Sequence, residues 1–357
     1  MGFRFIDLFA GIGGFRIALE KSGGTCVFSS EYDRFAQITH ESFFGEKPVF
    51  DKILEVYPPG DITQIPPHEV PDHEILAAGF PCQPFSLAGV SKKQSLGRPH
   101  GFEDPTQGTL FFNIKEILRI KKPEAFILEN VKNLRSHDGG RTFEVIMNAL
   151  KELDYEVTSG VIDAAHWVPQ HRERIFIVGF RKICSPASQG WEVKPGQFKL
   201  SGILPSKGKI ACLSSLLEES VSPRYTLGQG TWDTLIRHKT NHEAKGQGFG
   251  YGLLEPPFEG LNTRTLSARY HKDGAEILID QGGSSRPRRL TPLECCRLMG
   301  FPNKYQRYFD RRDNEKIQPV SDTQAYRQFG NSVAVPVVTA IASAVCRTLK
   351  EAKEISN

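Results

Sequence analysis

The chain has 357 residues, of which 39% are hydrophobic and 24% are charged, and its formal net charge is +4. These values are typical of a globular protein with a substantial core, and they exclude a low-complexity or disordered chain. The length predicts one large domain with a smaller one, or two domains. A net charge this small is compatible with nucleic-acid binding but is not evidence for it. The placement of the basic residues along the chain must show whether a nucleic acid is the partner.

Apolar β-type runs alternate with helical patterns along the first half of the chain. This rhythm predicts an α/β fold in which a parallel sheet is flanked by helices. The expected strands are 3–10, 25–31, 73–79, 124–130, 155–163 and 172–180. The expected helices are 14–23, one near 33–43, one through 108–120, and 141–153.

The rhythm stops at about residue 181, and the stretch 181–285 is rich in Gly, Pro, Ser, Lys and His. We expect a small, irregular second domain with short strands there. The alternative is a long disordered insertion, but aromatic and aliphatic residues persist throughout and argue against it.

A regular pattern returns at residue 286. A helix is expected with Thr291 as its N-cap and Pro292 at its first position, and the last helix, 335–352, is apolar enough to pack on the sheet. The second domain is therefore expected to be inserted in the first. The predicted units are 1–180, 181–285 and the return segment 286–357.

The seven cysteines are an odd number and show no zinc-ligand spacing. We therefore expect neither a disulfide framework nor a metal site. The thiols are expected to be reduced, as is usual in the cytoplasm. No run approaches the ~18 to 20 apolar residues of a membrane span, and the N-terminus lacks the layout of a signal peptide, so no membrane partner is expected.

The stretch "DLFAGIGG" (7–14) lies where a strand gives way to a helix. Glycines there allow a ligand to approach the backbone, and the helix N-terminus offers free N–H groups. Glu31 ends the next strand, where an acid can bind ribose hydroxyls, and Asp61 in "GDIT" is a candidate for an adenine amine. A purely structural turn and a nicotinamide-binding turn stay open, although Phe15 replaces the third glycine of the dinucleotide pattern.

The stretch "AGFPCQPFSLAG" (77–88) holds Cys82 between two prolines at the end of an expected strand. Catalytic residues of open α/β sheets lie at such ends, although a lone cysteine is more often a small buried side chain. Glu129 in "ENV" ends another strand at the same edge. A thiol and a carboxylate together permit a nucleophile and a proton donor, whereas a solvated surface charge is the plainer interpretation of the glutamate.

Two arginines, Arg172 and Arg174 in "QHRERIF", occupy alternate positions at the start of a strand, so both side chains point the same way. They are either ordinary surface arginines or a clamp for an anion or a carbonyl group.

The order of these blocks is more informative than any one of them. The chain contains, in order, "DLFAGIGGFR", "SSEYD", "GDIT", "GFPCQPFS", "ENV", "QHRERI", "RRLTPLECCRLMGFP" and "QFGNSVAVPV". In these blocks the sequence closely resembles the cytosine-C5 DNA methyltransferases. The resemblance covers about 1–180 and 286–350.

The resemblance implies a doubly wound, mostly parallel, Rossmann-like sheet that binds S-adenosylmethionine, with a smaller, irregular target-recognition domain. In the family's pattern the glycine turn lines the methionine and adenosine pocket, the glutamate binds the ribose, and "GNSV" closes the pocket. The cofactor residues implied in this way are Phe9, Gly11, Gly13, Glu31, Tyr32, Asp61, Asn331, Ser332 and Val333.

The implied reaction begins when the Cys82 thiolate adds to C6 of cytosine, which raises the electron density at C5. Glu129 would bind or protonate N3, and Arg174, with Arg172 nearby, would stabilise the O2 side. Methyl transfer to C5, loss of the C5 proton and release of sulfur would follow. The target base must be flipped out of the duplex before the thiolate can add to C6 or the methyl can reach C5.

The partner implied is double-stranded DNA. The polar, glycine-rich stretch 83–108 resembles the family's mobile catalytic loop, and basic residues cluster within the insert and after it. The DNA-contact candidates are Gln83, Ser86, Arg98, Arg264, Arg269, Tyr270, Lys272 and Arg288. The stretches 238–253 and 262–283 resemble recognition domains of bacterial enzymes that modify CCGG, CCNGG or CCWGG sites.

Other functions remain open at this point. A related branch methylates cytosine in tRNA, a degenerate relative would bind DNA without chemistry, and a nicotinamide oxidoreductase is suggested only by the glycine turn. The insert of roughly 100 residues favours DNA, and the presence of all the catalytic residue types argues against a silent reader. We expect a bacterial, cytoplasmic monomer that belongs to a restriction-modification system and needs no contact with the cognate endonuclease.

Overall fold

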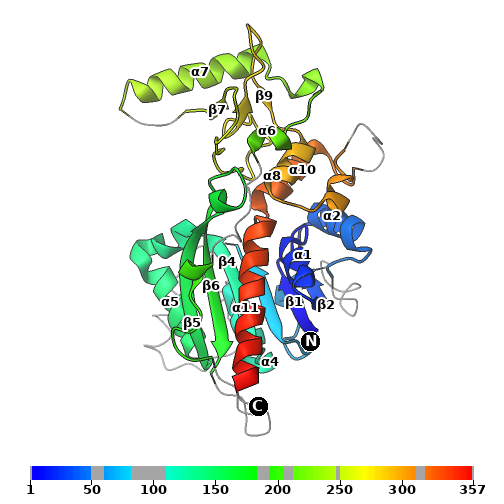
Figure 1. Cartoon of the computed structure of the whole chain (residues 1–357), viewed down its shortest axis with the longest axis vertical. Helices are drawn as coiled ribbons and strands as arrows, with labels where there is room; N and C mark the ends of the chain where they lie inside the picture. Colours follow the sequence, from blue (N-terminus) through cyan, green and yellow to red (C-terminus); the bar gives the residue numbers. More distant parts are fainter. Residues whose placement is uncertain are drawn as a thin grey trace.

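A computed structural model describes residues 2–49, 60–81, 110–182, 193–203, 212–246, 250–310 and 318–355. Figure 1 shows a larger part built around a central sheet and a smaller part above it that carries α7. The long helix α11 (Val335–Ile355) runs along the front of the larger part. Both chain ends lie in the lower half of this view, with the C-terminus below the N-terminus.

The central sheet has six strands in the order β2-β1-β3-β4-β6-β5. Neighbours pair in parallel from β2 to β4, whereas β6 pairs antiparallel with both β4 and β5. The strands are β1 (Phe3–Leu8), β2 (Gly24–Ser30), β3 (Ile75–Gly79), β4 (Ala125–Val131), β5 (Tyr155–Asp163) and β6 (Glu173–Arg181). The carboxyl ends of β1 to β4 and the start of β6 therefore meet at one edge, where open α/β sheets bind ligands.

Helices cover both faces of this sheet, because alternate side chains of each strand point to opposite sides. On β6, Phe176 and Val178 join one hydrophobic core, while Ile175 and Ile177 join the other. The first core contains α1 (Gly14–Lys21) and α11, and the second contains α4 (Leu110–Lys121) and α5 (Arg141–Lys151). The α/β class and the doubly wound, mostly parallel sheet are confirmed, and the expected strands and helices of the first half are present.

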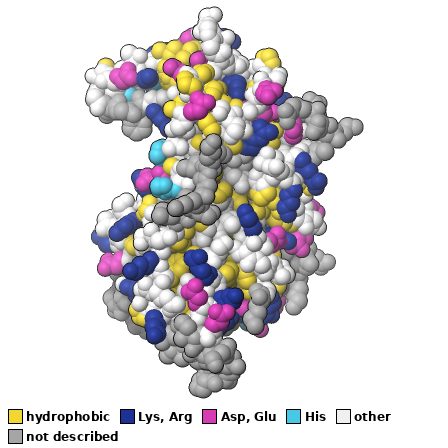
Figure 2. Space-filling view, in the orientation of Figure 1, with side chains coloured by type: hydrophobic (Ala, Val, Ile, Leu, Met, Phe, Trp, Pro, Cys, Tyr) yellow, Lys and Arg dark blue, Asp and Glu magenta, His cyan; other side chains and the backbone are white. Residues whose placement is uncertain are grey.

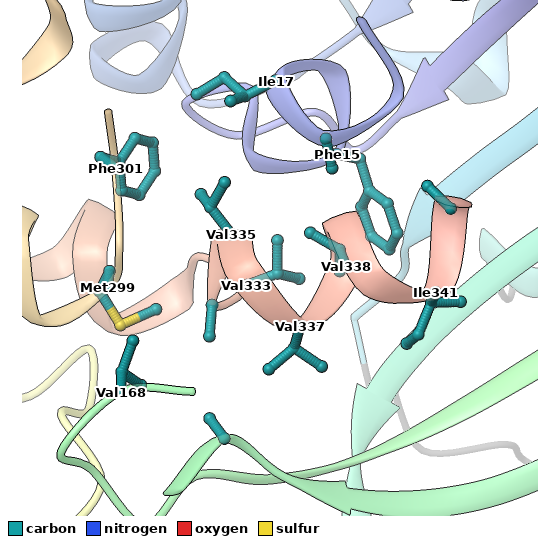
Figure 3. Packing of buried hydrophobic residues seen from close by; sticks show 14 of the residues in the cluster. Phe15, Ile17, Val168, Met299, Phe301, Val333, Val335, Val337, Val338 and Ile341 are labelled. Atoms are coloured by element: carbon teal, nitrogen blue, oxygen red, sulfur yellow. The ribbon is translucent and has the colours of Figure 1, made fainter. Parts of the chain in front are cut away.

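The last helix packs on the first, as Figure 3 shows. Phe15 and Ile17 of α1 point toward Val335 and Val338 of α11, while Val337 points away from α1. The described residues include one helical stretch, Asp322–Glu354, that is long and apolar enough to cross a membrane, contrary to the expectation that no run approaches that length. It contains the last helix expected from the sequence, 335–352. Because 61% of its apolar window is buried, it serves as a core helix of this fold.

The smaller part carries a three-stranded sheet in the order β7-β8-β9 and the long helix α7. Its strands are β7 (Leu253–Leu254), β8 (Leu278–Ile279) and β9 (Arg288–Arg289). The sheet uses residues on both sides of the predicted boundary at 285, so the insert and the return segment are joined by backbone pairing. The domain boundaries remain a prediction.

The remaining helices include four that the sequence did not predict, α6, α7, α9 and α10. They are α2 (Arg34–Phe44), α6 (Leu213–Leu216), α7 (Gln229–Glu243), α8 (Pro292–Leu298), α9 (Asn303–Gln306) and α10 (Asp322–Asn331). Short 3-10 helices are η2 (Ile62–Gln64), η3 (Lys132–Arg135), η4 (His137–Gly140), η5 (Ala164–His166), η6 (Leu200–Gly202) and η7 (Pro223–Tyr225). The expected start of α8 is confirmed, since Thr291 caps it and forms a capping box with Glu294.

A buried carboxylate joins β1 to α1. Asp7 is 1% exposed, and its Oδ2 accepts a hydrogen bond from the Arg16 amide at 3.2 Å. Its Oδ1 is buried and has no hydrogen-bond partner among the described residues. Burial raises the pKa of Asp7 from 3.8 to about 8, a shift that the Arg16 amide opposes.

This carboxylate makes stability depend on pH. Between pH values near its unfolded and folded pKa, the folded state binds more protons, so this group makes stability fall as pH rises. Asp7→Asn removes the titration. The free energy of unfolding of Asp7→Asn relative to wild type is therefore expected to rise between pH 5.5 and 8.5 by at least about 1.4 kcal/mol, the value of one pKa unit. Urea unfolding of both proteins at several pH values measures this, and a difference that stays constant contradicts it.

Candidate active site

A pocket of about 720 Å³ opens at the edge where β1 to β4 end. Most of its wall comes from the turns that follow these strands, and the rest comes from the start of β6 and the α10–α11 connection. Of the residues predicted from the sequence, it is lined by Phe9, Gly11, Glu31, Tyr32, Asp61, Glu129, Arg174, Asn331, Ser332 and Val333. The structure thus brings together most of the two predicted sets, cofactor-binding and catalytic, at one pocket.

The turn between β1 and α1 forms the first wall. Gly11 and Gly13 have positive φ angles of 54° and 81°, which favour glycine. A Cβ on Gly11 would meet no atom within 4 Å, so this backbone faces open space. Gly13 does not line the pocket; a Cβ there would lie 2.3 Å from the Phe44 ring, so this glycine lets α2 pack against the turn.

Glu31 connects the turn after β2 to the glycine turn. Its Oε2 accepts a hydrogen bond from the Gly11 amide at 2.8 Å, and its Oε1 accepts one from the Asp33 amide at 2.7 Å. Burial raises the pKa of Glu31, and these two amides oppose the shift. A carboxylate held in this way can accept hydrogen bonds from ligand hydroxyl groups.

An aromatic ring and a second carboxylate stand beside Glu31. Tyr32 is 65% exposed, so its face is available to a planar ligand group. Asp61 caps η2, and its Oδ1 accepts from the Thr63 amide at 3.0 Å and the Thr63 hydroxyl at 2.7 Å. The pocket therefore offers two acidic groups and an aromatic face on one side.

The opposite wall comes from α10 and the turn that follows it, within residues 324–333. Val333 lies against the glycine turn, because a Cβ on Gly14 would be 2.6 Å from Val333 Cγ2. The sequence analysis missed four lining residues of α10, which are Gln324, Arg327, Gln328 and Gly330. Three of them are polar and one is glycine, so this stretch of the sequence shows no apolar helical pattern that would have predicted the helix.

A buried ion pair lies deeper in the pocket. Arg174 Nε is 3.1 Å from Glu129 Oε1, and Glu129 is 8% exposed. Burial raises the pKa of Glu129, while the positive charges of Arg174 and Arg172 oppose the shift. Burial likewise lowers the pKa of Arg174. A carboxyl group in this setting can hold a proton or accept one from a bound ring.

Arg172 does not reach the pocket. It is 2% exposed, and both of its Nη groups donate to backbone carbonyl oxygens, of Leu266, Gly330 and Ser332. Both Nη groups are therefore engaged by the backbone, while Nε is buried and has no hydrogen-bond partner among the described residues. The role near the O2 side that the resemblance implies for Arg172 stays a prediction.

A further residue that the sequence analysis missed is Asn130, in the "ENV" block. Its buried side-chain amide donates to the carbonyl oxygen of Phe80 at 2.9 Å, two residues before Cys82. Asn130 thereby fixes the chain that leads into the predicted catalytic segment. Cys82 itself, with Gln83, Ser86 and Arg98, lies outside the described residues.

The predicted DNA contacts divide into two groups. Arg264, Arg269 and Lys272 are exposed. Tyr270 is fully buried, and its hydroxyl donates to the Ile277 carbonyl and accepts from the Leu290 amide. Arg288 is 6% exposed and pairs with Glu294 at 2.8 Å. These last two side chains belong to the interior, which corrects their predicted place on a DNA-contacting surface.

Figure 2 shows the distribution of charge on one face. Lys and Arg side chains lie among Asp and Glu rather than in one continuous patch, and the outline is indented between the larger and smaller parts. Within the described part of the chain, no three or more His, Cys, Asp or Glu residues are grouped so that they could hold a metal ion.

Similarity to known proteins extends over nearly the whole chain. The family described as "C-5 cytosine-specific DNA methylase" matches residues 3–347. The "DNA-cytosine methyltransferase" of Escherichia coli (strain K12) is 46% identical, over 98% of this chain and 79% of that protein. "Type II methyltransferase M.SsoII" of Shigella sonnei is 47% identical, over 97% of this chain and 81% of its own.

A more distant relative and a solved structure agree with these matches. "Type II methyltransferase M.HpaII" of Haemophilus parainfluenzae is 40% identical, over 97% of this chain and 90% of that protein. The crystal structure of S. pombe Dnmt2 methyltransferase aligns with a TM-score of 0.68 and 17% identity, over 98% of this chain and 99% of that one. At this identity the solved structure supports the fold alone.

Proposed function

Because this chain belongs to the C-5 cytosine-specific DNA methylase family and is a DNA-cytosine methyltransferase, we propose that it flips a target cytosine out of duplex DNA and methylates C5 from S-adenosylmethionine. The observation that carries this proposal is the buried Glu129–Arg174 pair on the wall of a pocket whose other side presents Glu31 and Tyr32. One side of the pocket has groups suited to a nucleoside, and the other has an acid and a cation suited to a pyrimidine ring.

S-adenosylmethionine fits the first side by its chemistry. The Glu31 carboxylate would accept hydrogen bonds from the ribose hydroxyls, and Tyr32 would lie against the adenine ring. Asp61 would accept from the exocyclic amine, while Asn331, Ser332 and Val333 would close the pocket. The bound group supplies an electrophilic methyl on a sulfonium. The chain's part is to hold that methyl in line with C5 of the flipped base.

The second side would activate the cytosine. The Cys82 thiolate adds to C6, forming a carbon–sulfur bond, and Glu129 provides a proton or hydrogen bond at N3 as charge accumulates there. Arg174 would donate to O2 and share that charge. C5 would then take the methyl as the sulfonium–methyl bond breaks and S-adenosylhomocysteine is left. The C5 proton would leave to a base, N3 would return its proton to Glu129, and the C6–sulfur bond would break to restore the ring and the thiolate.

The DNA would lie against the exposed basic residues of the smaller part. Arg264, Arg269 and Lys272 are the contacts to phosphate that we propose, and they would make binding weaken as salt rises. Side chains of the same region would read base edges in a specific site. We further propose that the enzyme acts as a monomer in a bacterial cytoplasm, within a restriction-modification system whose endonuclease it need not contact.

The test is transfer of a labelled methyl group from S-adenosylmethionine to duplex DNA and, in parallel, to tRNA. Label on C5 of cytosine within one DNA sequence is expected, and sequencing of the modified positions would give the recognition site. Label on tRNA alone would assign the chain an RNA substrate. DNA binding without transfer to either would leave a non-enzymatic reader and overturn the proposal.

A single glycine tests the cofactor side of the pocket. Gly60 has a φ of 81°, and a Cβ there would lie 1.8 Å from the Glu31 carbonyl oxygen. Gly60→Ala must therefore displace Glu31, and we expect affinity for S-adenosylhomocysteine to fall by about 10-fold, the value of one charge-assisted hydrogen bond. Titration calorimetry measures this.

Gly45→Ala is the matched control. Its φ of 77° imposes the same left-handed strain, yet a Cβ there would meet nothing within 4 Å. Gly45→Ala is expected to lose about 1–2 kcal/mol of stability from the left-handed strain alone, and Gly60→Ala more, because it must also displace Glu31. Only Gly60→Ala should lose affinity. Equal affinities in the two variants would contradict the assignment of this side of the pocket.

A further inference from the structure

The side chain of Arg172 links three backbone carbonyl groups from two distant parts of the chain. Its Nη1 donates to the Leu266 oxygen at 2.8 Å, and its Nη2 donates to the Gly330 oxygen at 2.9 Å and the Ser332 oxygen at 2.5 Å. None of these acceptors is a carboxylate. Burial lowers the pKa of Arg172 to about 9, the nearby charge of Arg174 adds to this, and Glu129 opposes it.

One side of this link is the pocket wall. Gly330 and Ser332 both line the pocket, at the end of α10 and just beyond it. The other side is the backbone stretch 263–268, which we call the junction segment. It carries Arg264, one of the proposed phosphate contacts, and is followed at once by Arg269.

The junction segment is also fixed to the chain that leads into β6. The His171 amide donates to the Thr263 oxygen, and the Thr263 amide donates to the Pro169 oxygen, both at 2.9 Å. The buried Gln170 accepts the Leu266 amide through its Oε1 at 2.9 Å. The segment is thus held by backbone bonds and by the buried side chain of Gln170.

The pocket wall and the junction segment touch at their backbones. A Cβ on Gly330 would lie 2.2 Å from the Ser267 carbonyl carbon and 2.3 Å from the Ala268 nitrogen. No side chain fits between the two, so a shift of one must move the other. Arg172 lies beside this contact and bonds to both partners.

We propose that Arg172 is a positioning residue that holds the cofactor-pocket wall and the DNA-binding junction segment in fixed register. This link fixes the positions of the methyl donor and of the DNA backbone relative to the Glu129–Arg174 pair. The inference rests on the proposed function, because it takes the pocket to hold S-adenosylmethionine and the junction segment to lie against DNA. It differs from the catalytic role that the sequence suggested for Arg172.

The test compares steady-state kinetics of Arg172→Lys and Arg174→Lys. A lysine ammonium cannot span three carbonyl groups as a planar guanidinium does. Arg172→Lys is therefore expected to raise KM for both S-adenosylmethionine and duplex DNA by about 10-fold each, the value of a lost charge-assisted hydrogen bond, with kcat changed by less than about threefold. Arg174→Lys is expected to lower kcat instead.

Arg288→Lys is the matched control, since Arg288 is also a buried arginine but bonds to Glu294 and lies away from the pocket wall. A merely structural role for Arg172 would reduce the melting temperature and the active fraction while leaving both KM values unchanged. That result, or a fall in kcat alone, would overturn the inference.

Two further outcomes are separable. Absence of methyl transfer by the wild-type enzyme would overturn the proposed function, whereas wild-type KM values in Arg172→Lys would overturn only this inference. If Arg172→Lys does not fold, Gly330→Ala tests the same contact from the other side and should raise both KM values. Failure of both variants to fold would assign the contact to stability alone and reject the positioning role.

Discussion

Glu129→Gln is expected to lower kcat for DNA methylation by about 100- to 1,000-fold, the range for loss of a group that stabilises developing charge or transfers a proton. The glutamine amide keeps the shape of the side chain and can hydrogen-bond to a ring nitrogen. It cannot deliver a proton to N3, and it no longer attracts Arg174, which lies 3.1 Å from the carboxylate. Affinity for S-adenosylhomocysteine should stay within about threefold, because the cofactor contacts lie elsewhere in the pocket.

The same substitution has an expected pH signature. Because burial raises the pKa of Glu129, its protonated form persists to higher pH than that of an ordinary glutamate, and kcat should decline as pH rises through that pKa. Glu129→Gln should lack this decline. Single-turnover rates across pH measure both effects.

Glu173→Gln is the control for the loss of a carboxylate at this edge of the sheet. Glu173 begins β6 and pairs with Lys132 at the surface, with its side chain 44% exposed. Its substitution should leave kcat near the wild-type value. If Glu129→Gln and Glu173→Gln behave alike, Glu129 does not act on the substrate.

Cys82→Ser is expected to abolish methylation, with a loss of at least about 1,000-fold, because a serine hydroxyl at neutral pH is a far weaker nucleophile than a thiolate. The readout should be independent of turnover. DNA with 5-fluorocytosine at the target position carries a fluorine in place of the proton that must leave C5, so the covalent adduct cannot be resolved. Wild-type enzyme should form a complex that survives denaturing electrophoresis, and Cys82→Ser should not.

Cys212→Ser controls for the loss of a partly exposed thiol, since Cys212 is free and lies in the smaller part. It should form the covalent complex as the wild type does. An adduct that persists in Cys82→Ser, or is lost in Cys212→Ser, would reassign the nucleophile.

The sequence predicted the sheet and the pocket well because both depend on local patterns. Strand ends marked by Glu31 and Glu129 lie where expected, since alternating β and α segments place the carboxyl ends of parallel strands at one edge. The N-cap at Thr291 likewise follows from three neighbouring residues. Each of these features is decided within a few positions of the chain.

The features that the sequence did not predict depend on distant partners. Arg172 and Arg174 are of the same type and lie two positions apart, yet one bonds to carbonyl groups from two remote segments and the other faces Glu129. Arg288 belongs to a basic cluster in the sequence, but Glu294 pairs with it in the interior. Helix α7 has no buried residues, so it lacks the apolar period by which a helix is found.

The packing of α11 on α1 also constrains how the chain matures. Helix α1 forms early in the chain, but the helix that covers it, Val335–Ile355, is the last one described. During synthesis the apolar face of α1 stays uncovered until residues 335–355 have left the ribosome. The pocket is unfinished for the same period, because Val333 closes it against the glycine turn. A chain that stops short of α11 would therefore expose this apolar face to chaperones and proteases and would lack a closed pocket.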